Sequence, residues 1–159
     1  MKARALIVST KSIANHGTWA TGKMPRTAFP LSKSATKAYK LSNRNWRVVV
    51  FEACGANCRL LINYSHALGQ YQALLGVQDG GDTKVVAALE LHPTHGGWHV
   101  HVGCDTDDVP PGIKRGPWVR CMSGKHTIFK RPCPANDDEA FQMAVDFFRL
   151  DKTPHRGWL

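Results

Sequence analysis

The residues with the clearest capacity for chemistry lie together in one stretch of thirteen, ELHPTHGGWHVHV, at positions 90–102. The stretch holds four of the chain's eight histidines and one carboxylate. Imidazole and carboxylate groups bind divalent metal ions such as Mn²⁺ and Zn²⁺. Two interpretations follow: a metal site, or a solvated histidine-rich hairpin that binds metal only adventitiously. The spacing of the polar residues favours the first.

That spacing predicts convergence on one face of a β-hairpin. Side chains alternate along a strand, so Glu90 and His92 share one face. His99 and His101 share one face of the next strand for the same reason. A four-residue loop, 94–97, would place His92 opposite His99 and Glu90 opposite His101, with opposed Cβ atoms about 5 Å apart. The polar set then lies on the outer face of the sheet, and the core is covered by the alternating apolar residues Leu89, Leu91, Trp98, Val100 and Val102.

This arrangement predicts a site for one divalent ion. We expect Glu90, His99 and His101 as ligands, with His92 as a candidate fourth. His95 falls in the turn and is left out of the ligand set. A register slip of one residue would bury the histidines, which is costly unless they have partners.

The elements that must position this hairpin are predicted from the hydrophobic pattern. A β-branched run at 46–54 indicates a strand, and leucines and tyrosines at helical spacing indicate a helix over 57–77. A Gly-rich turn at 78–82 ends that helix. The hairpin strands follow at 83–92 and 98–104.

The remainder of the chain predicts a loop, two short strands and a final helix. The loop covers 105–114 and the strands cover 117–122 and 126–130. Asn136 is placed as the helix cap, followed by three acidic residues that the helix dipole favours. The apolar face of this helix is Phe141, Ala144, Val145 and Phe148. The predicted fold class is α+β, a mostly antiparallel sheet with helices on one face, formed by residues 47–159 as a single domain.

The positive charge is concentrated ahead of this domain. The net charge is +9, and residues 1–47 hold ten Lys or Arg and no acidic residue. We expect residues 1–46 to form a basic, mostly irregular arm. Such an arm suits a polyanion, because each neutralised phosphate releases counterions, although a solubilising tail would have the same composition. The candidate nucleic-acid contacts here are Lys33, Lys37, Lys40, Arg44 and Arg47.

A second basic segment, KRGPWVR, follows the predicted metal hairpin. Cations around an aromatic ring could follow a phosphate backbone and stack on a base. A loop entering a strand would explain the same pattern. The candidate contacts are Lys114, Arg115, Trp118 and Arg120.

The amino-acid composition bears on the cellular compartment, on membrane association and on the state of the cysteines. No segment reaches the roughly 18 apolar residues of a membrane span, so we expect a cytoplasmic protein with no membrane partner. The five cysteines form an odd set without a CxxC pair, which indicates reduced thiols in preference to a disulfide framework.

The ELH–turn–HVHV pattern resembles the metal-binding motif of HUH endonucleases, the family of rolling-circle replication initiators and relaxases of plasmids and phages. His99-Val100-His101 matches the HUH triplet, and Glu90 takes the place of the upstream acid. The predicted β-α-β-β order before the motif is also similar. The resemblance covers residues 47–104. It implies an HUH-like fold and metal-dependent nicking and joining of single-stranded DNA, with Mn²⁺ or Mg²⁺ as the cofactor and Zn²⁺ as a further occupant.

The resemblance also implies a tyrosine nucleophile, and here the sequence departs from the family. Replication initiators carry that tyrosine after the HUH strand, whereas this chain has no tyrosine after Tyr71. Phe148 stands on the final helix instead and fits its apolar face. Relaxases carry the tyrosine ahead of the motif, which leaves Tyr39, Tyr64 and Tyr71 as candidates, the last two also having the spacing of a buried face.

Three functions are therefore open. The first is a metal-dependent DNA endonuclease of a mobile element. The second is a non-catalytic binder with the same scaffold, which blocks or regulates a nucleic acid or a nucleoprotein complex, as an inhibitor of a host defence nuclease would. The third is a small metal-binding domain without a nucleic-acid role, which the charge distribution favours least.

Overall fold

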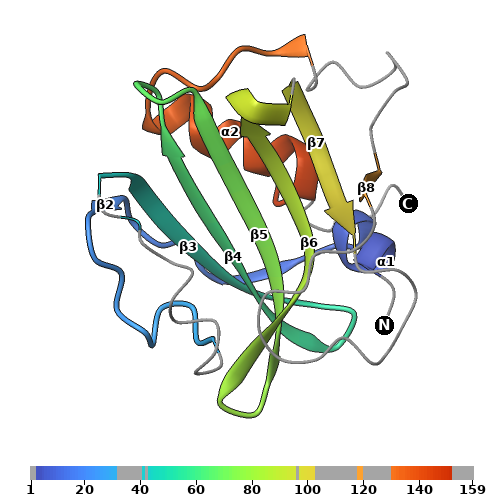
Figure 1. The fold of residues 1–159 in the computed structure, drawn as a ribbon. Helices are drawn as coiled ribbons and strands as arrows, with labels where there is room; N and C mark the ends of the chain where they lie inside the picture. Colours follow the sequence, from blue (N-terminus) through green and yellow to red (C-terminus); the bar gives the residue numbers. More distant parts are fainter. Residues whose placement is uncertain are drawn as a thin grey trace.

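The chain folds around one curved antiparallel sheet (Figure 1). The computed structural model describes residues 3–31, 41, 43–95, 97–102, 118–119 and 130–151. Seven strands follow one another in the order β1-β3-β4-β5-β6-β7-β8, and β2 pairs with β3 beside this path. The strands are β1 (Ser12–Asn15), β2 (Ala20–Thr21), β3 (Asn45–Ala53), β4 (Ala56–Ser65), β5 (Gln70–Asp79), β6 (Asp82–His92), β7 (Gly97–Val102) and β8 (Trp118–Val119).

Three strands, including the two of the histidine-rich hairpin, confirm part of the sequence prediction. β3, β6 and β7 form where strands were expected at 46–54, 83–92 and 98–104. β8 falls within the predicted strand 117–122. The loop 105–114 and nearly all of the strand 126–130 lie outside the described residues.

The predicted helix over 57–77 is wrong, because this segment forms the hairpin of β4 and β5. Its leucines alternate between two apolar clusters on opposite faces of the sheet: Leu60 belongs to one and Leu61 to the other. A strand buried on both faces gives a nearly continuous apolar run. Such a run also contains apolar residues at the three- and four-residue spacings of a helix, so periodicity alone does not distinguish the two. Gly69, at φ 61°, lies in the turn that reverses the chain.

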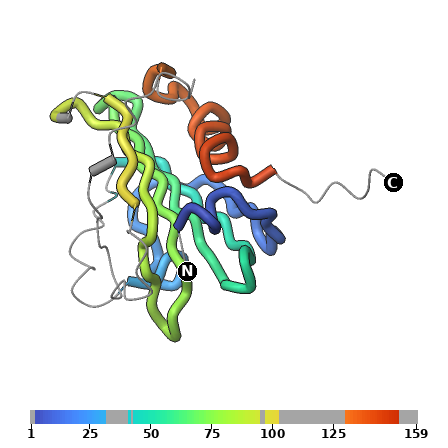
Figure 2. The backbone as a smooth tube through the Cα atoms, turned by 90° about the vertical axis from the view of Figure 1, so that its right-hand side faces the viewer, coloured from blue at the N-terminus to red at the C-terminus, as the bar shows by residue number. Residues whose placement is uncertain are grey.

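Two helices cover one face of the sheet. They are α1 (Ala3–Val8) and α2 (Asp137–Phe148), and their buried residues join the same core cluster as the sheet's inner face. Figure 2 shows α2 lying beside the sheet. The predicted cap is confirmed, since the Glu139 amide donates to Asn136 Oδ1 at 2.9 Å, and Phe148 is fully buried. The fold is α+β in kind and mostly β, with helices on one face.

The opposite face carries a smaller apolar cluster to which the basic N-terminal segment contributes. Phe29 is buried there against residues of β3 to β6, and the Trp46 indole donates to the Gly22 carbonyl at 3.0 Å. Trp19 packs against the larger cluster. The elements α1, β1 and β2 were not predicted. The described residues 3–31 therefore pack onto the sheet.

Two further features bear on the predictions from composition. Cys54, Cys58 and Cys133 are free thiols among the described cysteines. Burial raises the pKa of Cys58 to about 11, which keeps this thiol protonated. Within the part of the chain that the structure describes, no helix is long and apolar enough to span a bilayer.

Candidate metal centre

The centre lies where β6 meets β7, and its register differs from the predicted one. Glu90 pairs with His99, and His92 pairs with Gly97. The predicted pairs, Glu90 with His101 and His92 with His99, are wrong. Pro93 has no N–H to donate to the ladder and instead begins a short 3₁₀ helix, η1 (Pro93–His95), so the strands separate earlier than expected. The difference amounts to two residues, which keeps every side chain on its predicted face.

That face assignment is confirmed. The neighbouring apolar side chains of β6 and β7 pack into the cluster beneath α2: Leu89, Leu91, Trp98, Val100 and Val102. Glu90, His99 and His101 therefore project from the other face.

The ligand atoms lie at distances suited to one ion. Glu90 Oε2 is 3.3 Å from His99 Nε2, 3.4 Å from His101 Nε2 and 3.7 Å from His92 Nε2. Two ligand atoms that each lie about 2.1 Å from a tetrahedral ion are about 3.4 Å apart. One ligand atom from each of Glu90, His99 and His101 falls within 4.8 Å of the others. These three residues could hold a metal ion.

The three residues are buried, although the sequence placed them on the outer face of the sheet, and their burial disfavours the alternative of a solvated histidine-rich hairpin. Glu90 is 2% exposed, and His99 and His101 are each 3% exposed. A buried carboxylate costs free energy unless it is paired, so the cluster is a built site and not a solvated patch. His92 is more accessible, at 23%, and its Nδ1 makes a hydrogen bond of 3.0 Å with Thr94 Oγ1. It lies at the rim.

The tautomer of His99 favours a cation in the cluster. His99 Nδ1 lies 3.1 Å from the Gly97 carbonyl oxygen, which can only accept. In the neutral ring, Nδ1 therefore carries the proton and Nε2 directs its lone pair at Glu90 Oε2. Two acceptors 3.3 Å apart repel unless a proton or a metal ion lies between them. A backbone carbonyl that fixes the tautomer is a common feature of metal-binding histidines.

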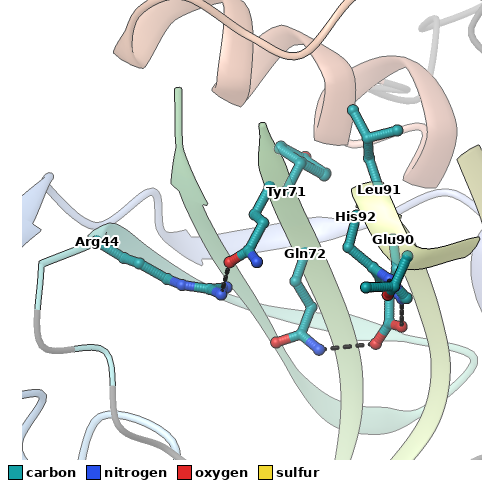
Figure 3. Close-up of a pocket in the computed structure, with 8 residues that line it drawn as sticks. Arg44, Tyr71, Gln72, Glu90, Leu91 and His92 are labelled. Carbon is teal, nitrogen blue, oxygen red and sulfur yellow. Dashed lines mark hydrogen bonds and ion pairs between the residues drawn. The ribbon is translucent and has the colours of Figure 1, made fainter. Parts of the chain in front are cut away.

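A row of polar side chains leads from Glu90 across the sheet, and sequence reasoning missed it. Gln72 Nε2 on β5 donates to Glu90 Oε1 at 2.7 Å (Figure 3). Asn63 Nδ2 on β4 donates to Gln72 Oε1 at 3.2 Å, and Arg44 Nη1 donates to Asn63 Oδ1 at 2.9 Å. The available signal was the presence of Asn63 and Gln72 in otherwise apolar strands.

A pocket of about 230 Å³ adjoins this row. Arg44 lies on one side of it and also donates to Gln70 Oε1, while Gln72, Glu90 and His92 lie on the other side (Figure 3). Partial burial lowers the pKa of Arg44, and the Glu90 carboxylate opposes that shift. Arg44 was predicted to contact nucleic acid, and the structure places it in the pocket that Glu90 also lines.

Tyr64 and Tyr71 lie on the opposite face of the sheet from Glu90, His99 and His101. Tyr64 Oη donates to Asp137 Oδ1 at 2.6 Å, and Tyr71 Oη donates to the Ala140 carbonyl at 3.1 Å. Both partners belong to α2. Burial raises the pKa of each hydroxyl, and for Tyr64 the hydrogen bond to Asp137 adds to the effect. The sheet separates both hydroxyls from Glu90, so neither lies beside the candidate metal ligands.

The other candidate residues are only partly covered by the structure. Arg47 stacks over the Phe141 ring at 3.8 Å and donates to the His16 carbonyl at 2.8 Å, so its side chain is engaged within the protein. Trp118 begins β8 and pairs with His101, which places this strand directly beside β7. The candidates outside the described residues are Tyr39, Lys33, Lys37, Lys40, Lys114, Arg115 and Arg120.

Comparison with known proteins assigns no family: no protein-family model, no curated protein and no solved structure matches this chain.

Proposed function

We propose that this protein binds one divalent metal ion through Glu90, His99 and His101, and uses that site to bind nucleic acid without forming a covalent link. The observation that carries the proposal is the buried position of Glu90 Oε2, within 3.4 Å of the Nε2 atoms of both His99 and His101. Two imidazoles and one carboxylate suit Mn²⁺ or Zn²⁺ better than Mg²⁺, which prefers oxygen ligands. An ion held by three protein ligands keeps coordination positions for external oxygens, such as those of phosphate.

The charge of the chain supports nucleic acid as the partner. A net charge of +9, with ten basic and no acidic residues in positions 1–47, favours association with a polyanion. Single-stranded DNA is the first candidate, and a nucleoprotein complex is the broader alternative.

The placement of the tyrosines favours binding over nicking. An HUH-type reaction needs a tyrosine hydroxyl beside the metal, whereas Tyr64 and Tyr71 donate their hydroxyl protons to α2 on the far face. The fold also differs from what the resemblance implied, since β3 to β7 run as consecutive antiparallel neighbours with no helix between β3 and β6.

Metal-dependent nicking and joining stays a second candidate through Tyr39. Arg44 lines the pocket beside Glu90, and Tyr39 precedes Arg44 by five residues. Five residues span at most about 18 Å, so the chain length allows this hydroxyl to approach the site.

One experiment separates the two candidates. Labelled single-stranded DNA is incubated with the protein and Mn²⁺, and the mixture is divided between a native binding assay and a denaturing gel. The proposal expects metal-dependent, salt-sensitive binding that His99→Ala weakens, and no adduct that survives denaturation. An adduct that disappears in Tyr39→Phe would establish nicking instead. Binding that is insensitive to both metal and His99→Ala would contradict a nucleic-acid role for the site.

A further inference from the structure

The row Arg44–Asn63–Gln72 ends at Glu90, and the role inferred for it here rests on the metal site proposed above. We propose that these three residues form a polarised hydrogen-bond chain that orients the Glu90 carboxylate toward the histidines. Gln72 and Arg44 are then positioning residues of the metal centre, although neither is a ligand.

The direction of the chain follows from its two ends. Arginine can only donate hydrogen bonds, and an ionised carboxylate can only accept them. Arg44 donates to Asn63 Oδ1, so the Asn63 amide group has its Nδ2 free to donate to Gln72 Oε1. Gln72 Nε2 must then donate to Glu90 Oε1. Both amides are held in one orientation, because reversing either would place donor against donor or acceptor against acceptor.

The hydrogen-bond chain determines which oxygen of Glu90 faces the histidines. Gln72 engages Oε1 at 2.7 Å, and the distances of 3.3 and 3.4 Å to His99 and His101 are made by Oε2. Without the Gln72 amide, the carboxylate could rotate about its terminal torsion, which is broad for glutamate. The bond to Gln72 therefore reduces the entropy lost when a metal ion fixes the carboxylate.

The sheet itself supports the chain. Asn63 pairs directly with Gln72 across β4 and β5, and Gln72 pairs directly with Glu90 across β5 and β6. Directly opposed side chains lie about 5 Å apart at Cβ, which suits a row of amides. Asn63 is fully buried, so water does not compete for its hydrogen bonds.

Removal of Arg44 would change the metal affinity in a direction that distinguishes this proposal from a simple charge effect. By Coulomb's law alone, a guanidinium near the site repels a metal cation, so removing its charge would strengthen metal binding. The hydrogen-bond chain predicts weaker metal binding instead, because loss of Arg44 releases Asn63 and, through it, Gln72. The direction of the effect therefore distinguishes orientation from simple charge.

The test uses three variants of the full chain. Gln72→Met removes the amide at similar length, and Arg44→Met removes the donor that starts the chain. Gln78→Met is the matched control: it makes the same change on the same face of β5, where Gln78 donates instead to Thr83 Oγ1. Mn²⁺ affinity is measured by titration calorimetry, and the absorption spectrum of bound Co²⁺ reports the ligand geometry. Thermal unfolding of the metal-free proteins reports the fold.

Loss of a partner that orients a metal ligand typically weakens metal affinity about 10–100-fold. We expect a loss in that range for Gln72→Met with an altered Co²⁺ spectrum, a smaller loss for Arg44→Met, and no change for Gln78→Met. If Gln72→Met does not fold, Arg44→Met decides the question by its sign. Unchanged affinity in Gln72→Met, or tighter binding in Arg44→Met, would overturn the inference while leaving the metal site intact. Failure of the wild-type protein to bind any divalent ion would overturn both.

Discussion

His99 lies directly across the β6–β7 ladder from Glu90, with its Nε2 3.3 Å from Glu90 Oε2 and its Nδ1 3.1 Å from the Gly97 carbonyl. This pairing fixes both the position and the tautomer of the imidazole. The ring is buried and can move little. A proton or a metal ion between the two facing atoms makes this contact stabilising.

His92 serves to test which imidazoles are ligands. It lies at the rim, 3.7 Å from Glu90 Oε2 and partly exposed. We expect His92→Ala to weaken Mn²⁺ affinity less than about tenfold, which is below the usual effect of losing even an outer partner of a ligand. Titration calorimetry checks this. A loss as large as that of His101→Ala would make His92 a fourth ligand.

Metal binding should stabilise the fold. An ion present at 100 times its dissociation constant adds about 2.7 kcal/mol to the free energy of unfolding. For a chain of this size, that raises the melting temperature by about 5–10 °C. Scanning fluorimetry with and without a chelator measures the shift. The same shift in His99→Ala would place the bound ion elsewhere.

Tyr64 should matter for stability and not for function. Tyr64→Phe removes the hydrogen bond to Asp137, which typically costs about 1–2 kcal/mol. DNA binding should be unchanged, because the hydroxyl lies on the far face of the sheet. A loss of binding without a loss of stability would return Tyr64 to the list of functional residues.

The same hydroxyl predicts a pH dependence at the alkaline end. Burial, with help from Asp137, raises the pKa of Tyr64 to about 12, whereas an unfolded tyrosine ionises near about 10. The stabilisation is therefore complete below pH 10 and is lost as the pH rises from 10 to 12. Chemical unfolding across this range should show a shallower decline in Tyr64→Phe than in the wild type. Equal slopes would contradict the assigned environment.

Gly76 tests how tightly β5 packs against Thr83 of β6 and Phe29 of the N-terminal segment. A Cβ at this position would lie 2.2 Å from Thr83 Cγ2 and 3.0 Å from the Phe29 ring. We expect Gly76→Ala to destabilise the protein by about 1–3 kcal/mol, as overpacking does. Gly81→Ala is the control, since a Cβ there meets nothing within 4 Å. Comparable unfolding midpoints for the two variants would contradict the close packing of Thr83 and Phe29 around Gly76.

The face of each polar residue in the hairpin could be predicted from sequence, because alternation in β6 and β7 depends only on local period. The register could not, since the 3₁₀ turn at Pro93 changes the pairing without changing the faces. The helix expected over 57–77 failed for a related reason: Leu60 and Leu61 fill opposite cores, a pattern that local spacing does not distinguish from a helix. Burial of Glu90 was also missed. It depends on tertiary packing.

The contribution of Gln72 and Asn63 shows where sequence reasoning ends. Each residue alone is an ordinary polar side chain within a strand. Their alignment with Glu90 exists only once β4, β5 and β6 pair in their observed registers. A metal ligand set within one hairpin is accessible from sequence, whereas the partners that orient it come from neighbouring strands.

The most direct test of metal binding by Glu90, His99 and His101 is the metal content of the purified protein after equilibrium dialysis against Mn²⁺, compared with that of His99→Ala and His101→Ala. We expect one ion per wild-type chain, and an affinity reduced by more than about 100-fold in each variant, since loss of even an outer partner costs about 10–100-fold. Equal metal content in the wild type and both variants would contradict it.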